Sequence, residues 1–185
     1  AGSLLLTFDA AATQSLVNQA LQSIAYANTS DTPPASVQID WSFSDGNAGA
    51  QGTGGNLTAS GSSTVSVTAV NDAPVITSNG GGDTASVNVA ENGTYVTTVT
   101  ATDADSAQSA LSYAIAGGAD ADKFSITASG VLSFKVAPDY EAPGDIGANR
   151  VYDLIVRVSD GYVADTQDIA VTVTAVNEAP ALGGL

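Results

Sequence analysis

The stretch Ala69-Val70-Asn71-Asp72-Ala73-Pro74-Val75 sets the organisation of this chain, because a near copy follows 106 residues later as Ala175-Val176-Asn177-Glu178-Ala179-Pro180-Ala181. The residues before each copy also correspond, so that 63–68 match 169–174 and 37–46 match 152–161. A period of this length is a whole domain and not a solenoid unit. Each copy places a proline after an alternating Val/Thr run, where the missing N–H ends strand pairing. The sequence therefore predicts β-rich modules in series, joined by short acidic links.

The repeat divides the chain into three segments. Residues 1–72 are expected to be the C-terminal part of an incomplete β-sandwich repeat, 73–178 a complete domain, and 179–185 a linker into a following repeat. The first segment carries the one expected helix, at about 13–25, because Thr13 offers an N-cap oxygen and apolar residues recur at helical spacing. Its apolar stripe is expected to pack on a sheet.

Too few strands are expected in the first segment to cover a core. They are predicted at residues 1–9, 37–43 and 62–70, with a Gly-rich loop through Gly55 between the last two. That loop contains Gly52-Thr53-Gly54-Gly55 but no following Lys or helix, so a phosphate-binding loop is not expected. The open sheet edge is expected to be covered by a neighbouring chain, by the helix, or poorly.

The second segment is expected to be an all-β, Ig-like Greek-key sandwich. Apolar residues alternate in about seven short runs with no second helix between them, a pattern typical of this fold. The runs cover residues 87–89, 95–101, 111–115, 124–126, 131–136, 152–158 and 169–175.

Composition restricts the partners of the chain. Acidic residues number 19 against 4 basic ones, giving a formal charge of −15, and the basic ones all lie in the second segment. Such a charge disfavours nucleic acid and anionic lipid and favours a cation. The chain has no Cys and no His, which excludes thiol chemistry, imidazole bases and common zinc sites. No apolar run approaches the roughly 20 residues that span a bilayer, so this segment is not expected to insert into a membrane.

The acids of the second segment fall in the turns between the predicted strands. In an antiparallel sandwich, turns after odd and even strands lie at opposite ends. One group of acids is therefore expected at the end facing the first copy of the repeated stretch, and another at the end facing the second copy. The first group is Asp103, Asp105 and Asp160, facing Asn71 and Asp72; the second is Glu91, Asp139 and Glu141, facing Asn177 and Glu178.

The order and spacing of these motifs resemble the cadherin repeat, in the form found in tandem arrays of large bacterial surface and secreted adhesins. The resemblance covers the whole second segment. Its motifs are Val89-Ala90-Glu91-Asn92, Ala101-Thr102-Asp103-Ala104-Asp105, Leu111-Ser112-Tyr113-Ala114-Ile115, Asp139-Tyr140-Glu141, Val158-Ser159-Asp160-Gly161 and Asn71-Asp72-Ala73-Pro74.

The resemblance implies that Ca²⁺ is bound at the joints between domains and stiffens the array. It assigns Asp103, Asp105, Asp160, Asn71 and Asp72 to the first joint. It assigns Glu91, Asp139, Glu141, Asn177 and Glu178 to the second joint. It also implies an extracellular or cell-surface location and calcium-dependent adhesion, with neighbouring repeats or like modules on other cells as partners.

The chain departs from the family pattern in ways that imply fewer than three ions per joint, or weaker binding. The linker has one acid fewer, and Ser109 stands near the place of an Asn that would supply a carbonyl. In the first segment Asp45 matches Asp160, while Asp31 is the nearby candidate to complete the first joint. The first half also resembles a related repeat of the same surface proteins, which implies no activity.

General chemistry agrees with a calcium site. Ca²⁺ takes six to eight oxygens at roughly 2.3–2.6 Å, and carboxylates and carbonyls on turns supply them. Without a cation, two carboxylates 4 Å apart repel by about 1–4 kcal/mol, depending on the effective dielectric constant. The alternative for each acid alone is a solvated turn residue, since Asp-Gly and Asp-x-Asp are common in turns.

Other functions stay open at this point. An enzyme would use Asp139 and Glu141 as the acid and base of a glycoside hydrolase, but two residues apart on an extended segment they would not flank a substrate, so catalysis is not expected. A passive spacer needs no ligand besides the stiffening ion. A polysaccharide-binding module would use aromatic platforms, for which the candidates are Trp41, Tyr26, Tyr140 and Tyr162.

Overall fold

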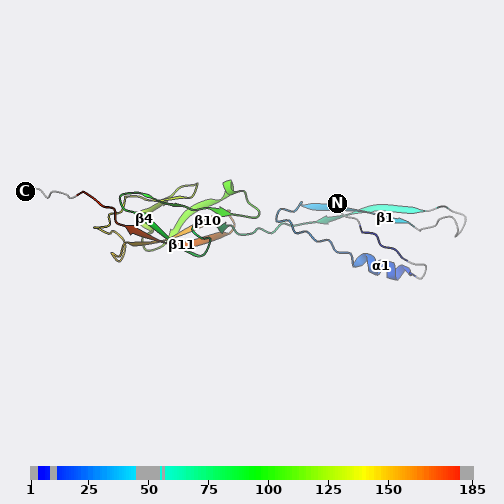
Figure 1. Cartoon of the computed structure of the whole chain (residues 1–185). Helices are drawn as coiled ribbons and strands as arrows, with labels where there is room; N and C mark the ends of the chain where they lie inside the picture. Colours follow the sequence, from blue (N-terminus) through cyan, green and yellow to red (C-terminus); the bar gives the residue numbers. More distant parts are fainter. Residues whose placement is uncertain (1–3, 9–11, 45–54, 56, 180–185) are drawn as a thin grey trace, which may run out of the picture.

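The computed structural model describes residues 4–8, 12–44, 55 and 57–179. Two β-rich parts follow one another along the chain (Figure 1). The first part holds helix α1 (Gln14–Gln22) and strands β1 (Ser36–Ser44) and β2 (Thr58–Ser66). The second part begins at residue 75 and holds the other strands with two short 3₁₀ helices.

The second part is built from short strands. They are β3 (Val75–Ile76), β4 (Thr84–Ala90), β5 (Tyr95–Thr98), β6 (Ala101–Thr102), β7 (Ser112–Gly117), β8 (Phe124–Ile126), β9 (Val131–Phe134), β10 (Val151–Ser159) and β11 (Ala164–Thr174). The 3₁₀ helices are η1 (Gln108–Ala110) and η2 (Ala121–Lys123).

The strands form the two facing layers of a sandwich. One layer is the sheet β4-β11-β10-β7, the other is β5-β9-β8, and β3 pairs with β6 as a short ribbon. Strand β10 is antiparallel to both neighbours, whereas β11 and β4 are parallel. The Ig-like sandwich is therefore confirmed, and one of its strand pairs, β4 with β11, is parallel. Strands of both layers lie between β4 and β11 in the sequence, so no hairpin turn connects these two strands and forces them to be antiparallel.

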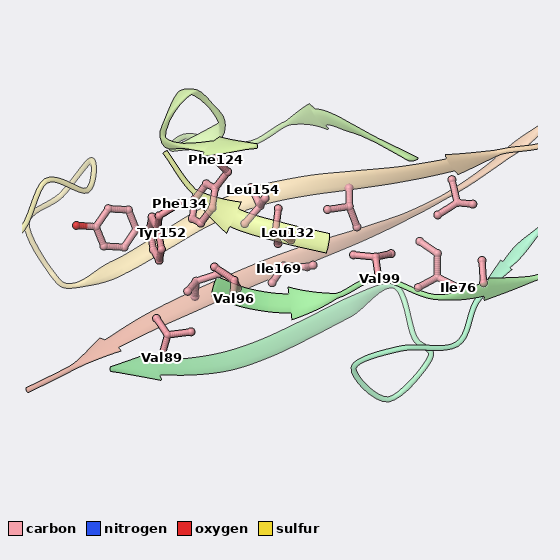
Figure 2. Close-up of a cluster of buried hydrophobic side chains, with 14 of the residues drawn as sticks. Ile76, Val89, Val96, Val99, Phe124, Leu132, Phe134, Tyr152, Leu154 and Ile169 are labelled. Carbon is pink, nitrogen blue, oxygen red and sulfur yellow. The ribbon is translucent and has the colours of Figure 1, made fainter. Parts of the chain in front are cut away.

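The core lies between the layers and is filled by alternate residues of the strands (Figure 2). Along β10, Leu154, Val156 and Val158 are at most 1% exposed. Phe134 of the opposite layer packs on Phe124, with ring centroids 4.4 Å apart, and on Tyr152, at 5.1 Å and nearly perpendicular. Each fully buried aliphatic or aromatic side chain contributes about 1.5–3 kcal/mol through removal from water. This core fixes the ends of the strands, and with them the acidic turns.

Several predicted elements are shifted or absent. Residues 4–8 form no strand, so the predicted strand at 1–9 is wrong over its described part. The run 95–101 is divided between β5 and β6, because the chain leaves the three-stranded sheet after residue 98 and pairs with β3. Strand β2 lies about four residues earlier than predicted, and residues 67–70 are not in a strand. The Gly-rich loop and Asp45 lie outside the described residues, apart from Gly55.

The first part has no core of its own among the described residues. Helix α1 begins as predicted, with the Thr13 hydroxyl oxygen accepting the N–H of Leu16 at 3.3 Å, but none of its residues is buried. Leu16 is 53% exposed, so the expected packing of the helix on a sheet is wrong. Strands β1 and β2 form an isolated antiparallel hairpin in which Trp41 lies opposite Gly61. A side chain at Gly61 would overlap the Trp41 ring, so the glycine leaves room for the indole.

Candidate functional site

The first acidic cluster lies where the linker enters the second part, and we call it the first pole. Its members come from the linker, from the turn after β6 and from the turn between β10 and β11. They are Asn71, Asp72, Asp103, Asp105 and Asp160. The Asn71 amide Nδ2 donates to Asp160 Oδ2 at 2.6 Å, and the Asp72 backbone N–H donates to Asp105 Oδ2 at 2.5 Å. The structure thus joins the linker to two separate turns of the sandwich.

Two aspartates of the first pole are held by their own turns. Asp103 Oδ1 accepts the backbone N–H groups of Asp105 and Ser106 at 2.9 and 2.7 Å. Asp160 Oδ1 accepts those of Tyr162 and Val163 at 2.8 and 2.9 Å. One oxygen of each carboxylate therefore orients the side chain. The other oxygen of Asp160 accepts the Asn71 amide, whereas that of Asp103 has no hydrogen bond.

Asp160 is stabilised as a carboxylate. The side-chain amide of Asn71 is the largest cause, and the backbone N–H groups of Tyr162 and Val163 add to it, so that together they lower the pKa of Asp160 below its usual value. Hydrogen bonds donated to the charged form have this effect in general. The group is therefore negatively charged at neutral pH, as a cation ligand must be.

Two oxygens of the first pole have no partner in the described part of the chain. Asp103 Oδ2 and Asp105 Oδ1 are buried and accept no hydrogen bond. A buried acceptor without a partner costs about 1–3 kcal/mol, and more when it is charged. Two such oxygens on neighbouring aspartates fit a bound cation, because they cannot satisfy each other.

The second acidic cluster lies at the other end of the sandwich, and we call it the second pole. Carboxylate oxygens of Glu91, Asp139 and Glu141 lie within 4.8 Å of one another. Glu91 follows β4, whereas the other two lie in the segment between β9 and β10. Glu91 is only 3% exposed, and its two oxygens accept the N–H groups of Val176 and Tyr140, each at 2.7 Å. Glu91 therefore connects the exit linker to the segment that carries the other two acids.

One of the two predicted exit-linker residues contacts the turn that carries Glu91, although its carboxylate is not among the three that lie within 4.8 Å of one another. Glu178 Oε1 accepts the side-chain N–H of Asn92 at 2.6 Å, whereas Asn177 is exposed and none of these hydrogen bonds involves it. Sequence reasoning did not assign a site role to Asn92. Its position directly after Glu91 in an Asn-Gly turn was the available signal. Asp31, the other predicted member of the first joint, is exposed and has no hydrogen bond to the first pole.

The alternative functions have less support in the geometry. Asp139 Oδ1 accepts the N–H groups of Glu141 and Ala142, so the two acids share one turn and do not face each other across a cleft. The Tyr140 ring, a predicted sugar platform, is half-buried and covered by the guanidinium of Arg150 at 4.3 Å. Trp41, Tyr26 and Tyr162 are exposed. None of the described helices has the length and apolar character needed to cross a membrane.

Comparison with known proteins shows where this architecture recurs. Residues 85–176 match the family model of the cadherin domain. Over 88 residues the chain is 40% identical to the Cadherin EGF LAG seven-pass G-type receptor 2 of Mus musculus and to that of Homo sapiens. This match takes in 46% of the chain but only 3% of either receptor.

Solved cadherin structures share the fold. Mouse Cadherin-23 EC22-24 matches with a TM-score of 0.55 and 23% identity, over 77% of this chain and 43% of that one. The Protocadherin gammaB7 EC3-6 cis-dimer structure matches with a TM-score of 0.54 and 25% identity, over 76% of this chain and 33% of that one. The predicted bacterial form of the repeat stays a prediction.

Proposed function

Residues 85–176 of this chain belong to the cadherin family, and we propose from this that the second part binds Ca²⁺ at both poles. The chain is then an extracellular or cell-surface module of adhesion type. In this proposal the ions at the first pole are bound by Asp103, Asp105, Asp160, Asn71 and Asp72. Those at the second pole are bound by Glu91, Asp139, Glu141, Glu178 and Asn177.

The observation that carries the proposal is the pair of buried, unpartnered oxygens at the first pole, Asp103 Oδ2 and Asp105 Oδ1. Ca²⁺ prefers carboxylate and carbonyl oxygens and tolerates irregular geometry, which suits ligands held on turns. Zinc sites use His and Cys, and the chain has neither. The donor set therefore fits a hard cation.

Calcium at the poles would stiffen the chain at its joints. Asn71 and Asp72 belong to the linker, and both already contact aspartates of the sandwich. An ion shared between the linker and these aspartates replaces two single hydrogen bonds by several ion–oxygen contacts. It also removes the mutual repulsion of the carboxylates, which otherwise opposes the closed arrangement. The expected result is a linker with a fixed direction.

The role of this stiffness is adhesion in our proposal. Neighbouring repeats of the parent protein are the first partners, because the pole residues come partly from the linkers. Like modules on other cells are the second, and a passive spacer is the alternative. The module acts without catalysis. Concentration-dependent self-association in calcium, measured by analytical ultracentrifugation, supports the adhesive role, whereas a protein that stays monomeric supports the spacer.

A polysaccharide-binding module is the second candidate, favoured by one observation. Trp41, Tyr26 and Tyr162 are 40%, 41% and 86% exposed, as aromatic sugar platforms must be. A glycan array tests this candidate directly. Binding that is lost in Trp41→Ala or Tyr162→Ala supports it, and an array without signal contradicts it.

Calcium titration by calorimetry tests the proposed function. We expect wild-type protein to bind Ca²⁺, Asp103→Ala to lose binding at the first pole, and Glu91→Ala to lose it at the second. Glu91 is buried, so Glu141→Gln, an exposed change, provides a second test of the same pole. The control is Asp168→Ala, which removes one exposed acid from β11 outside both poles. Wild-type protein that gives no heat with calcium would rule the proposal out.

A further inference from the structure

The two exposed acids of the second pole lie on a segment without strand or helix. Residues 135–150 connect β9 to β10, and Asp139 and Glu141 lie near the start of this connection. Such a segment has many accessible conformations unless specific contacts restrict it. The contacts that hold residues 135–150 therefore determine where these two carboxylates lie.

Two buried carboxylates outside both poles provide such contacts, and we call Asp120 and Asp145 the carboxylate clamp. Asp145, which is 8% exposed, accepts the N–H groups of Asn149 and Arg150 at 2.8 and 3.0 Å. Asp120, fully buried, accepts the N–H of Ile146 at 2.7 Å and that of Asp153 at 2.9 Å. Together they attach the end of the segment to the first residues of β10.

Backbone N–H groups satisfy the clamp without help from a basic side chain. Among the described residues the one ion pair joins Lys123 to Asp122, so neither Asp120 nor Asp145 has a cationic partner within 4.0 Å. Hydrogen bonds to a charged acceptor are about twice as strong as neutral ones. The turn that Asp145 closes also contains Ala148 and Arg150 at φ of +50° and +67°, a region that residues other than glycine rarely adopt. Both residues keep this backbone conformation because the surrounding contacts impose it.

Arg150 connects the clamp to the second pole. Its backbone N–H is bound by Asp145, and its Nε donates to the backbone oxygen of Tyr140 at 2.9 Å. Its guanidinium also covers the Tyr140 ring, 4.3 Å from the centroid. Tyr140 lies between Asp139 and Glu141, and its N–H donates to Glu91. A continuous set of contacts therefore runs from the buried clamp to all three carboxylates.

We infer that Asp120, Asp145 and Arg150 are positioning residues that preform the second pole before a cation binds. The inference rests on the proposed function, since the cation concerned is the calcium of that proposal. Groups behind the ligands of a metal commonly tune its affinity in this way, and their loss costs about 10–100-fold in metal affinity. If residues 135–150 are ordered before the cation binds, the entropic cost of fixing them is not part of the binding step. The first pole has no such support from the clamp, so it serves as a control within the same molecule.

Residue-resolved calcium titration by NMR tests the inference on the whole chain. The amide signals of Tyr140–Ala142 report the second pole, and those of Asp105 and Ser106 report the first. In Asp145→Asn the side chain keeps one acceptor oxygen, so either the Asn149 or the Arg150 backbone N–H loses its acceptor and faces an NH₂ group instead. We therefore expect calcium affinity at the second pole to fall by about tenfold. Affinity at the first pole should stay within about twofold of the wild-type value. A loss confined to the second pole would not result from general destabilisation of the domain. Asp168→Asn is the matched control, because it removes the same charge from an exposed position.

A second variant and a second measurement keep the test decisive. Arg150→Lys keeps the charge but removes the Nε donor and the planar stack on Tyr140, and it should lower second-pole affinity without loss of the fold. Hydrogen exchange in chelator should show protected N–H groups at Ile146, Asn149 and Arg150 in the wild type. Wild-type signals that do not shift with calcium contradict the proposed function itself. If both variants bind calcium at the second pole with wild-type affinity, or lose affinity equally at both poles, the inference is overturned while the proposed function stands.

Discussion

The hairpins β1–β2 and β10–β11 come from corresponding positions of the repeat but differ completely in burial. Ile39, Trp41 and Phe43 alternate along β1 and are 37–40% exposed. Their counterparts Leu154, Val156 and Val158 along β10 are at most 1% exposed. In the second part the hairpin is flanked by β4 and β7 and faces β5-β9-β8. In the described first part β1 and β2 have only each other. Alternation thus specifies a strand with one apolar face, whereas burial requires other strands to cover it.

The largest effect that separates the two hairpins is expected from truncation of their apolar face. Leu154→Ala should lower the free energy of unfolding of the second part by about 2–5 kcal/mol, because it leaves a cavity in a close-packed core. The corresponding Ile39→Ala should cost about 1 kcal/mol or less, because solvent already reaches this side chain. Urea denaturation measures both, with fluorescence of the single Trp41 reporting the first part and far-UV circular dichroism the whole chain. Equal losses in the two variants would contradict the difference in burial.

Calcium withdrawal should have an intermediate effect, confined to the second part and its joints. At free calcium 100 times above Kd, binding contributes about 2.7 kcal/mol per site to the free energy of unfolding. Chelator should therefore lower the Tm of the second part. It should also change the small-angle scattering profile, because motion at residues 67–74 lets the two parts adopt a wider range of relative orientations. The first part has no pole of its own in its described residues, so the fluorescence of Trp41 should not change when calcium is withdrawn. An unchanged melt together with an unchanged scattering profile would count against calcium at the poles.

The smallest expected effect is on the pH dependence of the joint between the two parts. The pKa of Asp160 is lowered, first of all by the hydrogen bond from Asn71, so this carboxylate stabilises the folded joint fully above the ordinary Asp pKa of about 3.8. The contribution is lost as the pH falls from there through the lowered pKa. Asn71→Ala should raise the pKa of Asp160 toward its ordinary value, measured by NMR titration of the carboxyl carbon in chelator. The same titration midpoint in variant and wild type would show that the linker does not act on Asp160.

Much of the fold of the second part was predictable, because period-two alternation and turn residues are local signals. They placed β7, β8, β9 and β10 close to their observed positions, and they found β4 and β11 but predicted their starts too late along the chain. The ribbon β3–β6 was not predicted, since two-residue strands are too short to show a period. The parallel pair of β11 with β4 was missed for a different reason. No local signal states which distant strand becomes a neighbour.

The members of the two poles were predictable for a topological reason. Successive turns of a sandwich alternate between its ends, so the acids of separate turns could be assigned to an end without knowing the register. The hydrogen bonds of Asn92 to Glu178 and of Tyr140 to Glu91 were not predictable, because they depend on the path of the exit linker and of residues 135–150. The same holds for Asp120 and Asp145, which the sequence presents as ordinary acids of a loop.

The linear chain alone specified the repeat, the strand pattern, the helix start at Thr13 and the excess of acids over bases. These properties depend on neighbours within a few residues, or on charge and composition summed over the chain. Only the folded arrangement decided which apolar face is buried, which aspartate oxygens lack a partner, and which acids hold the backbone instead of facing the linker. Those outcomes depend on contacts between residues tens of positions apart, and such contacts exist only once the two sheets have packed together.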